Sequence, residues 1–173
     1  RYVKQREKYF SSQPEYMARM TDRGSRYLFH IVEEVQRRGL PTELALLPFI
    51  ESAFNPEATS SARAAGMWQF MPATGRHFDL TQNIFRDDRR DVLASTSAAL
   101  DYLTQLHKMF GDWHLAIASY NGGPGRVQRA VKRTGIDNFW ELTDSSKHLP
   151  RETRDYVARL APLKGGRAQA SAM

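Results

Sequence analysis

The strongest constraint on the fold is the helical period of the residues between Asp91 and Phe110. Apolar or small side chains recur there at alternating steps of four and three, the spacing of one face of an α-helix, and Gly111 follows where a C-terminal cap belongs. These positions are Val92, Thr96, Ala99, Leu103, Leu106 and Phe110. No segment alternates apolar and polar residues for more than a few positions, so the sequence predicts an all-α protein with this helix central to its core.

Further helical patterns lie on both sides of this segment. Residues 12–38 predict a long helix that stops at Gly39, and Pro41 opens a strongly apolar helix to residue 50 that we expect to be buried nearly all round. A short helical piece is expected around Trp68, after a polar loop. Shorter helices are predicted over residues 113–120, from about residue 126, and over 150–160.

The length of 173 residues favours one domain. We expect this domain to cover residues 1–164, with an N-terminal helical extension over about residues 1–40. The small, polar residues 165–173 predict a disordered tail.

The composition excludes several classes of site. The chain has no cysteine, so thiolate metal sites, iron–sulfur clusters and a cysteine nucleophile are ruled out. The five histidines lack the compact spacing of metal ligands, and we expect no metal and no cofactor. No apolar run approaches the roughly 18 residues needed to cross a bilayer.

The charge is distributed unevenly. Residues 1–40 carry 9 basic and 5 acidic side chains, residues 41–125 carry 6 and 9, and residues 126–173 carry 10 and 5. A nucleic-acid-binding protein gathers positive charge around its working surface, whereas the densest motifs lie in the acidic middle. The basic ends therefore favour some other polyanion, or solubility alone.

Glu51 breaks the local pattern, because it follows the apolar run 46–50 and precedes Ala53 and Phe54. Desolvation in such a place would raise the pKa of a carboxyl group, which suits a general acid at neutral pH. The alternative is that Glu51 only ends the helix and faces solvent.

Three further segments bear on Glu51. Residues 66–72 read Gly-Met-Trp-Gln-Phe-Met-Pro, residues 118–127 read Ala-Ser-Tyr-Asn-Gly-Gly-Pro-Gly-Arg-Val, and residues 152–157 read Glu-Thr-Arg-Asp-Tyr-Val. With Glu51-Ser52, these segments resemble the lytic transglycosylase family, which has an all-α, lysozyme-like (goose-type) fold. Residues 40–48 and 89–96 resemble the membrane-bound branch of that family.

The resemblance implies a peptidoglycan lytic transglycosylase, which cleaves the β-1,4 bond between N-acetylmuramic acid and N-acetylglucosamine without water and leaves a 1,6-anhydromuramyl end. Glu51 would be its single catalytic acid and base. The other site residues implied by motif position bind substrate: Ser60, Gln69, Met71, Tyr120, Asn121 and Glu152. Of these, Tyr120 would hydrogen-bond near the catalytic carboxyl.

Each substrate-site position also has a plain structural explanation. Met71 can be a core residue, and Tyr120 a core tyrosine bonded to a backbone carbonyl. The glycines 122–125 can form only a helix–helix turn that needs positive φ, and Glu152 can be an acidic residue favoured by the helix dipole.

The interpretation as a lyase depends on the absence of a second catalytic carboxyl group. Ordinary glycosidases use two, but Glu57 and Asp79 lie in polar loop stretches with nothing in the sequence to fix them opposite Glu51. The substrate's N-acetyl oxygen would then stabilise the cationic centre. Two alternatives stay open: a goose-type lysozyme-like hydrolase of the same bond, and a catalytically idle glycan-binding module.

The resemblance also implies a location and a partner. We expect a monomer in the periplasm of the bacterial envelope, attached to the outer membrane by an anchor outside this segment. Its partner would be peptidoglycan glycan strands, with no nucleic acid.

Overall fold

The computed structural model describes residues 14–145 and 148–160. Over these residues the chain is helical, with isolated β-bridges in place of extended strands, so the all-α prediction is confirmed. The chain divides into two compact units, Arg1–Ala98 and Ala99–Met173. The single domain over 1–164 stays a prediction, and the predicted tail 165–173 lies outside the described residues.

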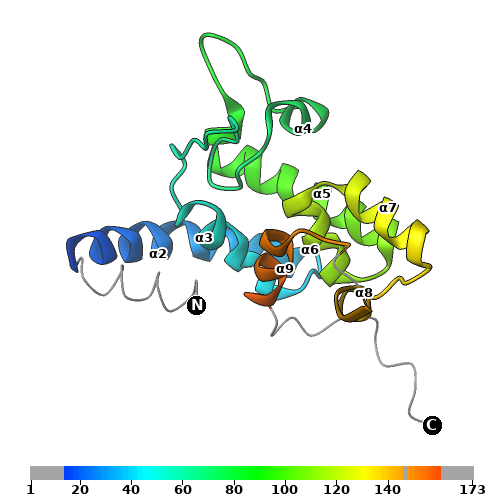
Figure 1. Cartoon of the computed structure of the whole chain (residues 1–173). Coiled ribbons are helices and arrows are strands. Elements are labelled where there is room, and N and C mark those ends of the chain that lie inside the picture. Colours follow the sequence, from blue (N-terminus) through cyan, green and yellow to red (C-terminus); the bar gives the residue numbers. More distant parts are fainter. Residues whose placement is uncertain (1–13, 146–147, 161–173) are drawn as a thin grey trace. The chain divides into compact units, whose positions relative to one another are not determined.

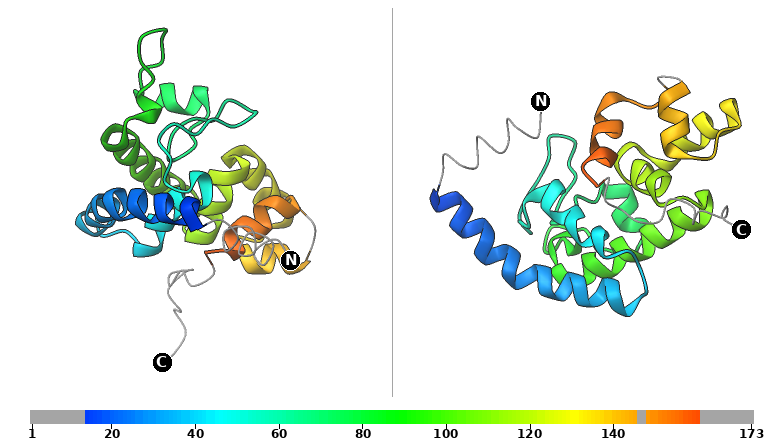
Figure 2. Two further views of the ribbon diagram at one scale, coloured as in Figure 1. Left: turned by 90° about the vertical axis from the view of Figure 1, so that its left-hand side faces the viewer. Right: turned by 90° about the horizontal axis from the view of Figure 1, so that it is seen from below.

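Among the described residues the first helix is α2 (Pro14–Arg37), a long helix seen in Figures 1 and 2. Ile31 and Val35 are fully buried on one face of α2. The helix is followed by Gly39 at a φ of 66°, which confirms the predicted stop.

The apolar segment after Pro41 differs from the prediction of one helix buried nearly all round. It is a 3-10 helix, η1 (Thr42–Leu46), followed by α3 (Leu47–Ser52). Pro48 lies in the first turn of α3, where a missing N–H costs nothing, so it starts a helix and does not bend one. Leu46 and Phe49 are 46% and 40% exposed, so the burial prediction was wrong for one face.

A long connection of turns leads from α3 to α4 (Pro72–His77), and η2 (Asp88–Arg90) precedes α5 (Val92–Phe110). The helical piece expected around Trp68 is wrong, because residues 66–69 form a turn. Trp68 is nevertheless fully buried, and its Nε1 donates to Thr96 Oγ1 of α5 at 3.0 Å. This bond fixes the turn to the start of the predicted central helix.

The second unit contains the rest of α5, with Ala99, Leu103 and Leu106 buried as predicted. In the described part of this unit α5 is followed by α6 (Trp113–Gly122), α7 (Pro124–Thr134), α8 (Phe139–Ser145) and α9 (Arg151–Ala158). Helix α6 is buried from Trp113 through Ser119 and packs against α7 and α9. The sequence did not predict α8.

The buried Asp112 joins two of these helices. Its carboxylate accepts His114 N at 2.9 Å, which caps α6, and Phe139 N at 3.1 Å, at the start of α8. Burial raises the pKa of Asp112, but the His114 side chain and these two backbone hydrogen bonds together lower it below its ordinary value. In the described part of the chain, no helix is long and apolar enough to cross a membrane.

Candidate active site

Glu51 lies in the last turn of α3 and is half-buried. The next residue ties this helix end to a distant turn, because Ser52 Oγ lies 2.8 Å from Met67 O and 3.0 Å from Pro48 O. The same oxygen accepts Asn55 N at 3.2 Å. Ser52 therefore fixes the helix end that carries Glu51 against the turn that carries Gln69.

Strained backbone clusters around this helix end. Ala53 and Phe54, directly after α3, have φ values of 51° and 58°, and Arg63 and Gln69 have 67° and 53°. Non-glycine residues adopt such angles only where the surroundings impose them, and these residues gather at functional sites. The strain marks residues 51–69 as a candidate site independently of any motif.

The turn at residues 66–70 is held by close backbone contacts. Gly66 has a φ of +82°, and a Cβ there would lie 1.8 Å from Arg89 O, so only glycine fits. Gln69 Nε2 donates to Ala58 O at 3.2 Å and to Gly66 O at 2.8 Å. Both amide hydrogens of Gln69 point to the backbone, which leaves its Oε1 to accept a hydrogen bond from a ligand.

Ser60 and Met71 lie on either side of this turn. Ser60 Oγ accepts Ala64 N at 3.0 Å, which shapes the loop, and its hydroxyl proton is left to donate elsewhere. Met71 precedes α4 and is 45% exposed, so the alternative that it is a core residue is not what the structure shows. The first unit thus links the Glu51 helix and the loop of Ser60 and Gln69 in one hydrogen-bonded segment.

A buried arginine that the sequence analysis did not single out holds this loop from the other side. Arg89 is 8% exposed, and its Nη1 donates to Arg63 O at 2.8 Å and to Phe70 O at 3.0 Å. Its Nε and Nη2 bind the carboxylate of Asp87 at 2.9 and 2.7 Å. These hydrogen bonds lower the pKa of Asp87, which therefore stays ionised.

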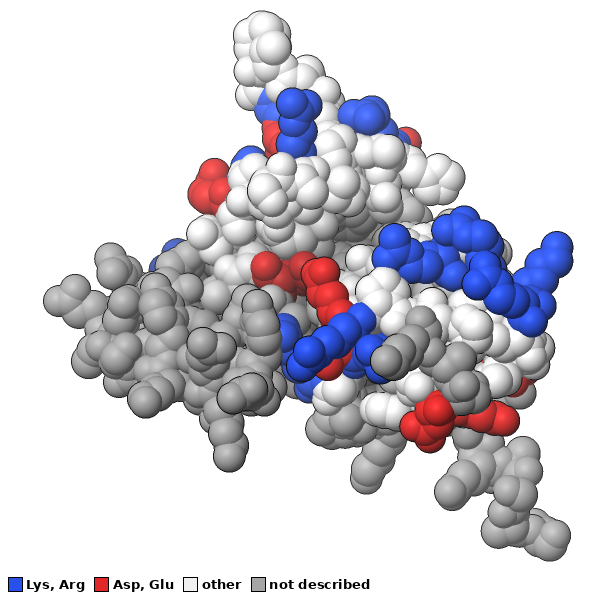
Figure 3. Space-filling model, in the orientation of Figure 1, with Lys and Arg blue, Asp and Glu red and all other residues white. Residues whose placement is uncertain are grey.

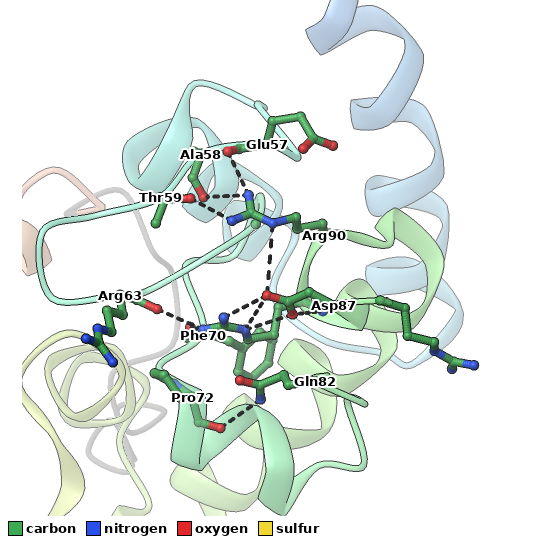
Figure 4. A network of polar contacts seen from close by, with 12 residues as sticks. Glu57, Ala58, Thr59, Arg63, Phe70, Pro72, Gln82, Asp87 and Arg90 are labelled. Carbon is green, nitrogen blue, oxygen red and sulfur yellow. Dashed lines mark hydrogen bonds and ion pairs between the residues drawn. The ribbon is translucent and has the colours of Figure 1, made fainter. Parts of the chain in front are cut away.

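Arg90 extends the network to the start of the loop, as Figure 4 shows. Its guanidinium donates to Glu57 O at 2.7 Å and to Thr59 Oγ1 at 2.6 Å. Two arginines from η2 therefore fix the loop backbone at both its ends. The only local signal was the Asp-Asp-Arg-Arg-Asp run at 87–91, which does not say what it contacts.

In the second unit, Tyr120 lies near the end of α6 and packs beside a second tyrosine. Its ring centroid is 5.6 Å from that of Tyr102 of α5, with the planes tilted by 43°. Burial raises the pKa of Tyr102, so this phenol stays protonated and can donate a hydrogen bond. Tyr102 was not predicted as a site residue.

The corner after Tyr120 is closely packed. Asn121 is half-buried, and a Cβ on Gly122 would lie 2.9 Å from Thr153 Oγ1 of α9, so glycine lets α6 and α9 approach. Thr153 is 2% exposed, whereas its neighbour Glu152 is exposed on the first turn of α9. Thr153, the residue after Glu152, is therefore the one that lies against Gly122.

Two further groups of side chains concern the chemistry: those that could hold a metal ion, and a second carboxylate beside Glu51. The described residues contain no group of three or more His, Asp or Glu side chains that could hold a metal ion. Glu57 and Asp79, the carboxylates weighed as partners of Glu51, are both exposed, and Glu57 enters the network through its backbone carbonyl.

Several known proteins that are similar to this chain are lytic transglycosylases. The Transglycosylase SLT domain family matches residues 29–143. The membrane-bound lytic murein transglycosylase D of Escherichia coli K12 is 45% identical over 168 residues, which are 94% of this chain and 36% of that protein. The lytic transglycosylase Slt of Pseudomonas aeruginosa, solved as an inactive mutant, matches 75% of this chain and 22% of its own, with 34% identity and a TM-score of 0.58.

A complex of the 70-kDa soluble lytic transglycosylase with bulgecin A also matches, with 26% identity and a TM-score of 0.60 over 70% of this chain and 20% of that one. The chain belongs to the Transglycosylase SLT domain family and has the helical, lysozyme-like fold of its structural neighbours. It spans 36% of the length of its Escherichia coli relative.

Proposed function

We propose that this chain is the catalytic part of a peptidoglycan lytic transglycosylase, with Glu51 as its acid and base. The family match over residues 29–143 carries the proposal, because it includes Glu51 together with the loop of Ser60 and Gln69. The strained, hydrogen-bonded surroundings of Glu51 support it from the structure.

In the proposed reaction Glu51 acts twice. As the acid it protonates the glycosidic oxygen between N-acetylmuramic acid and N-acetylglucosamine, and the C1–O bond breaks. The substrate's N-acetyl oxygen stabilises the positive charge at C1. Glu51, now a carboxylate, then takes the proton of the muramyl 6-hydroxyl as that oxygen bonds to C1, which yields the 1,6-anhydro ring and restores the acid.

The other motif residues are proposed to bind the glycan. Met71 offers an exposed apolar surface to a sugar face, Gln69 Oε1 accepts a sugar hydroxyl or N-acetyl N–H, and the Ser60 hydroxyl donates. Tyr120 and Asn121 are proposed to bind the strand. Glu152, exposed on the first turn of α9, is also proposed to bind the strand.

We also propose a place of action. The related protein of Escherichia coli is named as membrane-bound and as acting on murein. By this likeness the chain acts as a monomer on peptidoglycan strands in the bacterial envelope, in the periplasm and attached to the outer membrane through a part of the protein beyond this chain.

The test is a comparison of Glu51→Gln with Glu57→Gln in release of soluble fragments from purified peptidoglycan. The first removes the transferable proton and should lower the rate by at least about 100-fold, the lower range for general acid–base catalysis. The second changes an exposed carboxyl in the connection that follows α3 and should leave the rate unchanged. More than a tenth of the activity in Glu51→Gln would show that another group is the acid.

A further inference from the structure

Helix α7 carries a strongly basic face that the proposed reaction does not use. Val127 and Ala130 are buried, whereas four cations of α7 are exposed: Arg126, Arg129, Lys132 and Arg133. The helix contains no acidic residue. Figure 3 shows Lys and Arg side chains gathered over the place that α7 occupies in Figure 1.

Lys132 and Arg133 lie in the last turn of α7, where the helix dipole favours a cation, but Arg126 and Arg129 gain no such stabilisation. None of the four cations forms an ion pair with another described residue, whereas the exposed Arg26, Arg37 and Arg86 each do. Like charges three or four residues apart repel each other by a few tenths of a kcal/mol. Arg126 also lies in the first turn, where the helix dipole disfavours a cation. The face therefore holds unpaired charge at an energetic cost.

The spacing of the arginines makes a stripe. Arg126, Arg129 and Arg133 are separated by three and four residues, so they lie along one side of α7. The helix begins directly after the corner of Gly122 and Gly123, and Gly123 has a φ of +90°. Because Tyr120 and Asn121 precede this corner, the stripe leads away from the segment that we propose binds the glycan.

We propose that the basic face of α7 binds the carboxylates of the peptide stems carried by the glycan strand. The inference rests on the proposed function, because it places the strand beside Tyr120 and Asn121. Stem peptides carry free carboxylates, and guanidinium groups bind carboxylates through paired hydrogen bonds. The enzyme would then prefer strands that carry their stems over bare glycan.

The composition of α7 favours this partner over a membrane surface. A helix that lies in a lipid interface presents large apolar residues to the acyl chains. The apolar residues of α7 are small or medium in size, and Val127 and Ala130 are buried within its own unit. The exposed side offers charge alone, which suits a soluble anionic polymer.

The experiment measures binding of soluble glycan strands in a Glu51→Gln background, so that the strand stays intact. Strands with peptide stems are compared with strands stripped of stems by an amidase. The test variant adds Arg126→Gln, Arg129→Gln and Arg133→Gln. The control variant adds Arg26→Gln, Arg37→Gln and Lys108→Gln, which remove the same charge from other exposed positions.

We expect the test variant to bind stem-bearing strands at least about 5-fold more weakly, since each exposed ion pair contributes modestly. Added salt should reduce the difference, and the control and the bare strands should show none. The proposal would be overturned if the test variant lost no affinity, or lost it equally for strands with and without stems. It would also be overturned if the control variant lost as much affinity as the test variant. If binding to anionic phospholipid vesicles depended on these arginines and binding to the strands did not, the face would be assigned to lipid instead. Cleavage by the unmodified chain is measured in parallel, and its absence would refute the proposed function without deciding the role of α7.

Discussion

Replacing Arg89 with methionine should destabilise the first unit far more than replacing a neighbouring arginine. The methionine fills much of the same volume but removes both hydrogen bonds to Asp87, at 2.9 and 2.7 Å, and the bonds to Arg63 O and Phe70 O. Asp87 would keep its charge with only 22% of its side chain exposed. Removing one partner of a fully buried pair costs about 3–5 kcal/mol in the free energy of unfolding. Because Asp87 is partly exposed and keeps Arg90 Nε at 4.0 Å, we expect a loss at the lower end of this range.

Arg86→Met is the matched control. Arg86 binds Asp88 at 2.6 Å, but the Arg86 side chain is 62% exposed and its guanidinium is paired with that carboxylate, not with the loop carbonyls. Exposed pairs contribute about 0–1 kcal/mol. Urea unfolding of both variants gives the comparison, and equal losses would refute the assignment of Arg89 as the residue that fixes the loop.

The pH dependence gives a second measure of the same pair. Hydrogen bonds from Arg89 hold the pKa of Asp87 below its ordinary value. Its stabilisation is therefore complete above the unfolded-state pKa of about 3.9 and is lost as the pH falls through the lower folded-state pKa. In Arg89→Met the stability should fall less steeply over this acidic range.

Three further outcomes are expected. Tyr120→Phe should raise the activation free energy of turnover by about 1.5–3 kcal/mol, the range for a hydrogen bond to a charged group, and leave the melting temperature nearly unchanged. A normal rate with a lowered melting temperature would make this tyrosine structural. Asp112→Asn should lower the free energy of unfolding by about 1–3 kcal/mol, because the amide cannot accept from both His114 N and Phe139 N as the carboxylate does; an unchanged urea midpoint would contradict this. EDTA should leave peptidoglycan cleavage unchanged, whereas a loss restored by a divalent ion would reveal a metal site.

The helices with a regular apolar period were predictable from local sequence. In α5 and α2 the buried residues recur every three or four positions, and Gly111 and Gly39 follow the helix ends at positive φ. Helix α8 has only seven residues, too few to establish a period, and it was missed. Its start depends on Asp112, which lies far back in the sequence.

The turn around Trp68 shows where local reasoning fails. The segment looked helical, but the carbonyl of Arg89 lies where a side chain on Gly66 would be, and Gln69 is held at positive φ. Both constraints come from contacts with residues distant in the sequence. For the same reason Arg89 and Arg90 were not identified as loop supports, although Glu51, Ser60 and Gln69 were predicted as site residues through their motif.

The most direct test of the central claim is mass spectrometry of the fragments that this chain releases from purified peptidoglycan. A transglycosylase that uses Glu51 without a water nucleophile predicts 1,6-anhydromuramyl ends, which are lighter than hydrolysed ends by one water. It also predicts that these ends disappear in Glu51→Gln. Reducing muramyl ends in the products of the unmodified chain would identify a hydrolase and contradict the account.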